Sequence, residues 1–154
     1  MRKCNSLQGF SFVELIMVMG MLIIISSFAI PYSLNIVSRR NVQDATEDIA
    51  SNLWRQQQNA YSGNENKNYG ISFTENGYTI FKWEDGNPNE TQADITLETG
   101  ITITNITFDD LSSEITFGEG EILPSTFGSL DVTDGGNTFQ VTINAQGLID
   151  YSLL

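Results

Sequence analysis

The chain has 154 residues, enough for one globular domain with an accessory segment, and its side chains sum to a charge of −12. No lysine or arginine follows Lys82, which disfavours a surface that binds nucleic-acid phosphates. The chain has no histidine and one cysteine, Cys4, which excludes an internal disulfide, a Cys/His zinc site and a histidine-dependent catalytic site. We therefore predict no enzyme activity, no bound metal and no cofactor.

The N-terminal part combines a short basic head with a long apolar run. Residues 1–9, MRKCNSLQG, are polar, and Glu14 is the only charge between Phe10 and Ile30. As a helix this run would be roughly 31 Å long, about the thickness of a bilayer core. It predicts a transmembrane helix over 10–31, with a kink at Pro31. A cleaved secretory signal is the alternative, because Ser27-Phe28-Ala29 has the small-x-small pattern of a cleavage site.

Residues 32–62 continue the helix with a different pattern. Apolar residues recur there with helical spacing, and polar residues occupy the other sides. The apolar positions are Val42, Ala45, Ile49, Leu53 and Ala60. The turn formers of SGNENKN, 62–68, end the helix. One long helix is thus expected from about Phe10 to about Tyr61.

The remaining residues, 63–154, have the two-residue period of strands. In YGISFTENGYTIFKW, Asn76-Gly77 predicts a hairpin turn, since both residues accept positive φ. GNPNETQAD is expected to be a loop, and β-rich runs follow at 95–108, 113–120, 128–132 and 137–154. The predicted fold class is α+β: a long N-terminal helix, transmembrane in its first half, packed on a C-terminal antiparallel β-sheet domain.

The junction between head and apolar run carries a specific motif. Gly9 followed by FSFVEL, with a basic leader before it and Pro31 after it, resembles the type IV prepilin signal of the type IV pilin-like and pseudopilin family. The resemblance implies that a prepilin peptidase removes the leader, 1–9, between Gly9 and Phe10 and methylates the new amine. It also implies that Glu14 pairs with the Phe10 amine of a neighbouring subunit when the helices assemble.

The same resemblance implies a structural subunit, of the minor kind, in a type IV pilus or a type II secretion pseudopilus. Its partners would be other pilin or pseudopilin subunits, the prepilin peptidase, an inner-membrane assembly platform and membrane lipid, with no nucleic acid. The protein would be a single-pass inner-membrane protein with its C-terminal domain outside the cytoplasm, and part of an extracytoplasmic filament after assembly. A membrane-anchored extracytoplasmic binding domain that does not polymerise is the alternative.

Two downstream segments refine the resemblance. DIASNLWRQQQNAYSGNENKNYGISF and FQVTINAQGLIDY are similar to the H-type minor pseudopilins and related minor pilins. Members implicated in DNA uptake have basic residues near the last turn, whereas this chain has Asp150 there. Calcium at the acidic turns, Asp131 with Asp134 and Asn137 or Glu119 with Glu121, is the weaker interpretation of these residues, because the spacing differs from an EF-hand loop.

Overall fold

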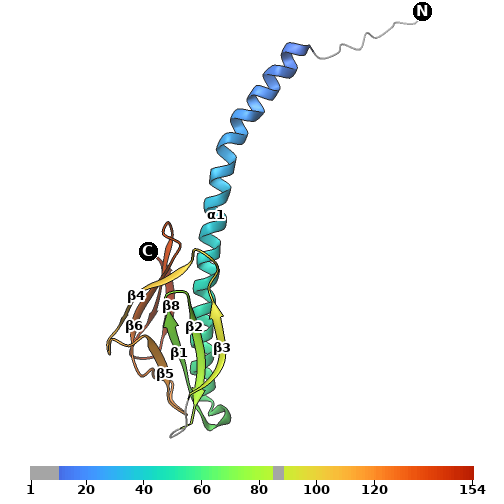
Figure 1. Cartoon of the computed structure of the whole chain (residues 1–154). Helices are drawn as coiled ribbons and strands as arrows, with labels where there is room; N and C mark the ends of the chain where they lie inside the picture. The colour runs from blue at the N-terminus through green and yellow to red at the C-terminus, as the bar shows by residue number, and fades with distance from the viewer. Residues whose placement is uncertain (1–10, 85–88) are drawn as a thin grey trace, which may run out of the picture. The chain divides into compact units, whose positions relative to one another are not determined.

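A computed structural model describes the backbone over residues 11–84 and 89–154 (Figure 1). The long helix α1 spans Phe12–Tyr61, and its side chains are described over 12–27 and 36–61. The chain divides into two units, Met1–Val37 and Ser38–Leu154, and each is described by itself. The second unit contains the end of α1 and all the strands.

The C-terminal end of α1 is set by a glycine. Gly63 adopts a left-handed conformation, with φ 63° and ψ 31°, which a glycine reaches at little cost. Its N–H donates to the carbonyl of Ala60 at 3.0 Å, closing the last turn. A short 3-10 helix, η1 (Asn64–Asn66), then turns the chain into the first strand. The helix therefore ends at Tyr61, beside the turn formers seen in the sequence.

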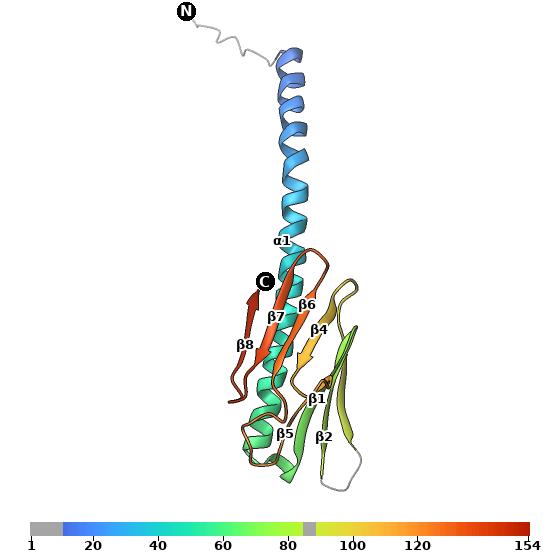
Figure 2. The same ribbon diagram turned by 90° about the vertical axis from the view of Figure 1, so that its left-hand side faces the viewer.

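Eight antiparallel strands follow in two four-stranded sheets. The first sheet has the order β3-β2-β1-β5 and contains β1 (Asn68–Thr74), β2 (Gly77–Trp83), β3 (Glu90–Thr96) and β5 (Glu114–Phe117). The second has the order β4-β6-β7-β8 and contains β4 (Thr102–Phe108), β6 (Gly128–Thr133), β7 (Thr138–Ile143) and β8 (Ile149–Leu153). Figure 2 shows β8 as the outermost strand of the second sheet.

One core joins both sheets to the second half of α1. The helix contributes Val42, Ile49, Leu53 and Ala60, all fully buried. Each sheet adds alternate side chains from the face turned toward the helix, as a half-buried sheet requires. These are Tyr69, Ile71, Phe73, Tyr78, Ile80, Ile115 and Phe117 from the first sheet, and Ile103, Phe108, Leu130, Val132, Phe139, Val141 and Ile143 from the second.

The predicted fold class is therefore wrong in its main feature, a single sheet packed on one long, partly transmembrane helix. The strands form two separate hydrogen-bonded sheets, and β5, the edge of the first, is only four residues long. The second sheet also contains an irregularity in β4, where the register with β6 shifts between Thr104 and Thr107. Asn105 in this bulge has φ 48°, which bends the strand.

The predicted membrane helix is also corrected. Among the residues that the structure describes, no helix is long and apolar enough to cross a membrane. This finding contradicts the single-pass inner-membrane localisation that was predicted from the sequence.

Two local predictions between β1 and β3 also differ from the structure. The β1–β2 turn consists of Glu75 and Asn76, and Gly77 is already the first residue of β2, paired with Thr74. None of these turn residues has positive φ. The predicted loop at 86–94 overlaps β3, which begins at Glu90 and pairs with β2 along its length. A polar, exposed edge strand has no apolar alternation and is therefore hard to recognise in sequence.

A buried glutamine attaches two loops to α1. Gln57 is 4% exposed, and its amide nitrogen donates to the carbonyl oxygens of Ile122 at 2.8 Å and Gly147 at 2.7 Å. Gly147 must be a glycine, because its φ is 79° and a Cβ would lie 2.5 Å from the same amide nitrogen. One side chain thus fixes the loop before β6 and the turn before β8.

Replacing Gln57 by leucine should lower the free energy of unfolding by about 2 kcal/mol, because two carbonyl groups lose their donor. Chemical denaturation of the full chain in detergent measures the change. Gln58→Leu, one residue along the helix, is the control, since no hydrogen bond of its side chain ties a loop to α1. Equal stability of the two variants would contradict the attachment.

Candidate functional site

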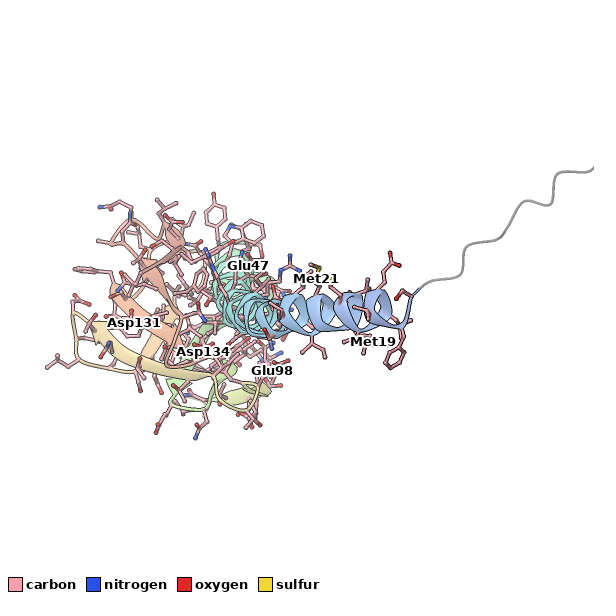
Figure 3. All side chains as sticks on the ribbon, turned by 90° about the horizontal axis from the view of Figure 1, so that it is seen from above. Met19, Met21, Glu47, Glu98, Asp131 and Asp134 are labelled. Carbon is pink, nitrogen blue, oxygen red and sulfur yellow. The ribbon has the colours of Figure 1, made fainter. Side chains whose placement is uncertain are left out.

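The first described part of α1 carries exposed apolar side chains on every side of the helix. From Phe12 to Ile25 each large apolar side chain is between 51% and 76% exposed. Figure 3 shows these side chains radiating from the helix, with Met19 and Met21 on opposite sides. A helix that is hydrophobic all round is normally buried in its working state. We call Phe12–Ile25 the apolar segment.

Glu14 is the one charged residue of the apolar segment. It lies in the first turn of α1 and is exposed. A carboxylate there is favoured by the positive end of the helix dipole, typically by about 0.3–1 kcal/mol. In the described part of the chain, no ion pair involves Glu14. The carboxylate is therefore available to a cation of another chain.

The other predicted processing and assembly residues fall where the structure gives no side-chain description. Gly9 and Phe10 lie outside the described residues. Pro31 lies within α1, in the stretch 28–35 whose side chains are outside the description, so the predicted kink stays a prediction. The structure therefore locates Glu14 alone among the predicted site residues.

The acidic turns considered for calcium are engaged in hydrogen bonds. Asp131 accepts bonds from the side-chain amides of Asn105 at 2.8 Å and Gln140 at 3.0 Å. Asp134 accepts from the Ser38 hydroxyl and from the backbone N–H of Gly136 and Asn137. Within the described ranges, no group of three acidic, histidine or cysteine side chains could hold a metal ion.

The bonds around Asp134 have an electrostatic consequence. The Ser38 hydroxyl, followed by the N–H of Asn137, holds the pKa of Asp134 well below its usual range. Because Ser38 belongs to α1 and Asp134 follows β6, this carboxylate joins the helix to the β6–β7 turn. Asp134 therefore caps the turn between β6 and β7 through its hydrogen bonds.

Two lysines and two glutamates form an ion-pair network at the start of β1 and the end of β2. Lys82 lies 2.6 Å from Glu65, and Lys67 lies 2.9 Å from Glu90. The crossed pairs are longer, at 3.8 Å for Lys67–Glu65 and 3.9 Å for Lys82–Glu90. Glu65 has φ 55°, so the network helps to hold η1 in an unusual backbone conformation.

The network gives stability that depends on pH. The hydrogen bond from Lys82 lowers the pKa of Glu65 below its ordinary 4.5, and the bond to Glu65 raises the pKa of Lys82 above 10.5. A lowered carboxyl pKa stabilises the fold above the unfolded pKa, and this stabilisation is lost as pH falls through the folded pKa. The lysine contribution is lost only at high pH, as pH rises through its folded value.

Lys82→Met should therefore flatten the stability profile between neutral pH and the acid side of pH 4.5. Thermal unfolding at several pH values measures it, with Arg55→Met as the matched control, since Arg55 has no ion pair among the described residues. Parallel profiles for Lys82→Met and the unmodified protein would show that the network contributes nothing.

Comparison with protein-family models, curated proteins and solved structures gives no match for this chain. Sequence reasoning missed Gln57 and the lysine–glutamate network. It also missed the hydrogen bond that the Tyr151 hydroxyl of β8 donates to Glu47 of α1 at 3.0 Å. Each depends on residues distant in sequence, and a polar residue on a helix gives no signal of its partner. The only signal for Gln57 was its place near the apolar stripe of α1.

Proposed function

We propose that this protein is a structural subunit of a filament of the type IV pilus or type II secretion pseudopilus kind, which polymerises through its N-terminal helix. The observation that carries the proposal is the apolar segment, whose side chains are exposed on all sides in the single chain. Burying a large apolar side chain contributes about 1.5–3 kcal/mol, so packing several of these against neighbouring helices gives a strong drive to assemble.

The position of Glu14 supports the same proposal. A free carboxylate in an apolar surface disfavours random association, since it must find a cation before it can be buried. The motif GFSFVEL supplies one: cleavage after Gly9 creates a new amine on Phe10, four residues before Glu14. Pairing that amine with Glu14 of a neighbouring subunit sets the register between helices. The proposed partners are thus a prepilin peptidase, other pilin-like subunits and the platform that assembles them.

In the proposed filament, the strand domain lies outside the packed helices. No residue after Lys82 is basic, so this domain is strongly negative. The negative charge keeps the domains mutually repulsive and soluble while the helices associate. The same lack of basic residues argues against nucleic acid as a partner. The type of filament, pilus or pseudopilus, follows from the partners that the subunit meets.

Intact mass and N-terminal sequencing of the protein from its native source test the proposal. A mature chain that begins at N-methylated Phe10, and appears only when the prepilin peptidase is present, is the expected result. An N-terminus at Met1 would favour a chain that is never processed or polymerised. A start at Ile30 would identify an ordinary cleaved signal, and the role of Glu14 would be lost.

A further inference from the structure

Four strands form the edges of the two sheets, and three of them carry features that block further pairing. β3 has a register shift next to Ala93 and two carboxylates, Glu90 and Asp94. β4 has the bulge at Asn105, and β5 has four residues and a bridge to Pro124. Bulges, charges, short strands and proline are the usual protection of a sheet edge.

β8 has one charged side chain, Asp150, and none of the other protective features. It pairs with β7 in unbroken register from Ile149 to Leu153, and it contains no proline, glycine or lysine. Figure 2 shows nothing beyond it in its sheet. The ladder extends one residue further at each end, since Asn144 donates to Leu148 at 3.1 Å and Leu154 donates to Thr138 at 3.0 Å.

These two bonds show which backbone groups of β8 are free. In an antiparallel pair, the residues that bond to the partner strand alternate with residues whose groups point away. Leu148 and Leu154 bond to the β7 side, so Ile149, Tyr151 and Leu153 direct their N–H and C=O groups to the open edge. In the single chain the N–H of Tyr151 donates to the Asp150 carboxylate at 2.8 Å, a bond that pairing at this edge would replace.

The residues of this edge read almost the same in both directions. In LIDYSLL, residues 148–154, two apolar residues and one polar residue stand on each side of Tyr151. An antiparallel copy centred on Tyr151 places Ile149 opposite Leu153 and Leu148 opposite Leu154. Asp150 then faces Ser152, so no two carboxylates are opposed, which matters in a chain of charge −12.

We infer that β8 is a self-pairing edge, at which a second copy of this chain adds its own β8 antiparallel across a two-fold axis at Tyr151. In this register the open groups of Ile149, Tyr151 and Leu153 meet those of the same three residues, as hydrogen bonding requires. The pairing joins two four-stranded sheets into one and covers Leu148 and Leu154, which are 66% and 67% exposed.

The neighbouring flank of α1 adds to this surface. The Tyr151 hydroxyl donates to Glu47 at 3.0 Å, which places this side of the helix beside β8. Trp54 lies two helical turns beyond Glu47 on the same side and is 59% exposed. Exposed tryptophan and tyrosine beside an open strand edge are typical of the centre of a protein interface.

The symmetry of the pair distinguishes it from filament assembly. A two-fold axis sets the two strand domains, and the helix ends within them, in opposite directions, whereas the subunits of a polar filament all point the same way. Pairing at β8 is thus a state of the subunit outside the filament. It goes beyond the proposed function, and its test does not depend on whether the chain polymerises.

Register-specific disulfide formation tests the pairing in the full chain. In a Cys4→Ser background, Asp150→Cys and Ser152→Cys are made in separate chains, which are then mixed in a zwitterionic detergent and oxidised. Opposed positions 150 and 152 would lie about 4.5 Å apart at Cα, within disulfide range. Positions 150 and 150, or 152 and 152, would be about 8 Å apart, too far for a disulfide.

The mixed product should exceed each self-product by roughly tenfold, because only the mixed pair meets disulfide geometry. Peptide mass mapping identifies the joined positions. Thr91→Cys mixed with Thr96→Cys, on the protected β3 edge, is the control and should give no preference. Equal yields of mixed and self-products, or a yield no higher than in the β3 control, would overturn the inference.

A proline provides a second measurement on the same mixture. Leu153→Pro removes an N–H that points to the open edge and leaves the β7–β8 bonds in place. It should reduce the mixed disulfide to the level of the β3 control while the thermal unfolding of the chain changes little. An undiminished mixed product in a folded Leu153→Pro chain would exclude backbone pairing at β8.

Discussion

Glu14→Ala is expected to leave the strand domain folded and to remove the chain from filaments. The variant keeps the apolar segment but, in the proposed filament, would leave the amine of a neighbouring Phe10 without its carboxylate. Loss of one partner of a buried ion pair costs about 3–5 kcal/mol, which corresponds to a drop in incorporation of roughly a hundredfold or more. Filament preparations from cells that express the variant, quantified by immunoblot against whole-cell protein, measure the effect.

The matched control for this experiment is Glu75→Ala. Glu75 is an exposed carboxylate in the β1–β2 turn, with the same change of charge and no place in the apolar segment. It should be incorporated normally. Normal incorporation of Glu14→Ala would show that the carboxylate is a tolerated surface charge and would contradict the proposed role of Glu14 in assembly.

Gly77→Ala, at the buried first residue of β2, is expected to produce a large loss of stability. A Cβ on Gly77 would lie 2.1 Å from the carbonyl oxygen of Ile95 and 3.1 Å from Cα of Thr96. Backbone atoms cannot move aside as a flexible side chain can, so β3 must shift away from β2. Overpacking of this kind typically costs about 1–3 kcal/mol, and we expect the upper part of that range.

Chemical denaturation followed by tryptophan fluorescence measures the effect, because Trp83 ends the strand that Gly77 begins. Gly136→Ala is the control: its nearest neighbour would be the Asp134 carboxylate at 3.5 Å, and its φ is not positive. It should change stability by less than about 0.5 kcal/mol. Equal stability of both variants would show that β3 adapts to the added methyl group.

Gly77 also illustrates what sequence could and could not predict about the fold. The Asn76-Gly77 pair correctly indicated a hairpin, but for the wrong reason. The turn uses Glu75 and Asn76 without positive φ, and the glycine is required where β3 passes close to it. A dipeptide pattern reports local conformation and carries no information about a strand that arrives from a distant part of the chain.

β3 and the division into two sheets were hidden for related reasons. β3 is polar and exposed along nearly its whole length, so its pairing with β2 rests on backbone bonds that leave no apolar pattern. The partition into two sheets depends on which strands pair, and alternation in one strand does not name its neighbour. The end of α1 was predictable because Gly63 and the polar residues around it act locally.

The candidate site, in contrast to the fold, was predicted mainly from the sequence. The residues that resemble the prepilin signal form one continuous segment, so the sequence alone led to the predictions for Gly9, Phe10 and Glu14. The structure adds that the apolar segment is exposed all round and that Glu14 has no ion pair within the described residues. The inference about the β8 edge required both the sequence and the structure. The near-palindrome is read from the sequence, and the position of β8 at the end of its sheet follows from the strand order.

The lysine–glutamate network has a practical consequence for experiments on the native protein. Apart from Lys3, Lys67 and Lys82 are the only lysines of the chain, and both amines are bound by carboxylates. Acylating reagents therefore find few free amines on the folded domain, and a rise in labelling at Lys82 would report the opening of η1. Trypsin, which cuts after lysine and arginine, has no target beyond Lys82, so everything from Trp83 to Leu154 leaves the digest as a single acidic peptide.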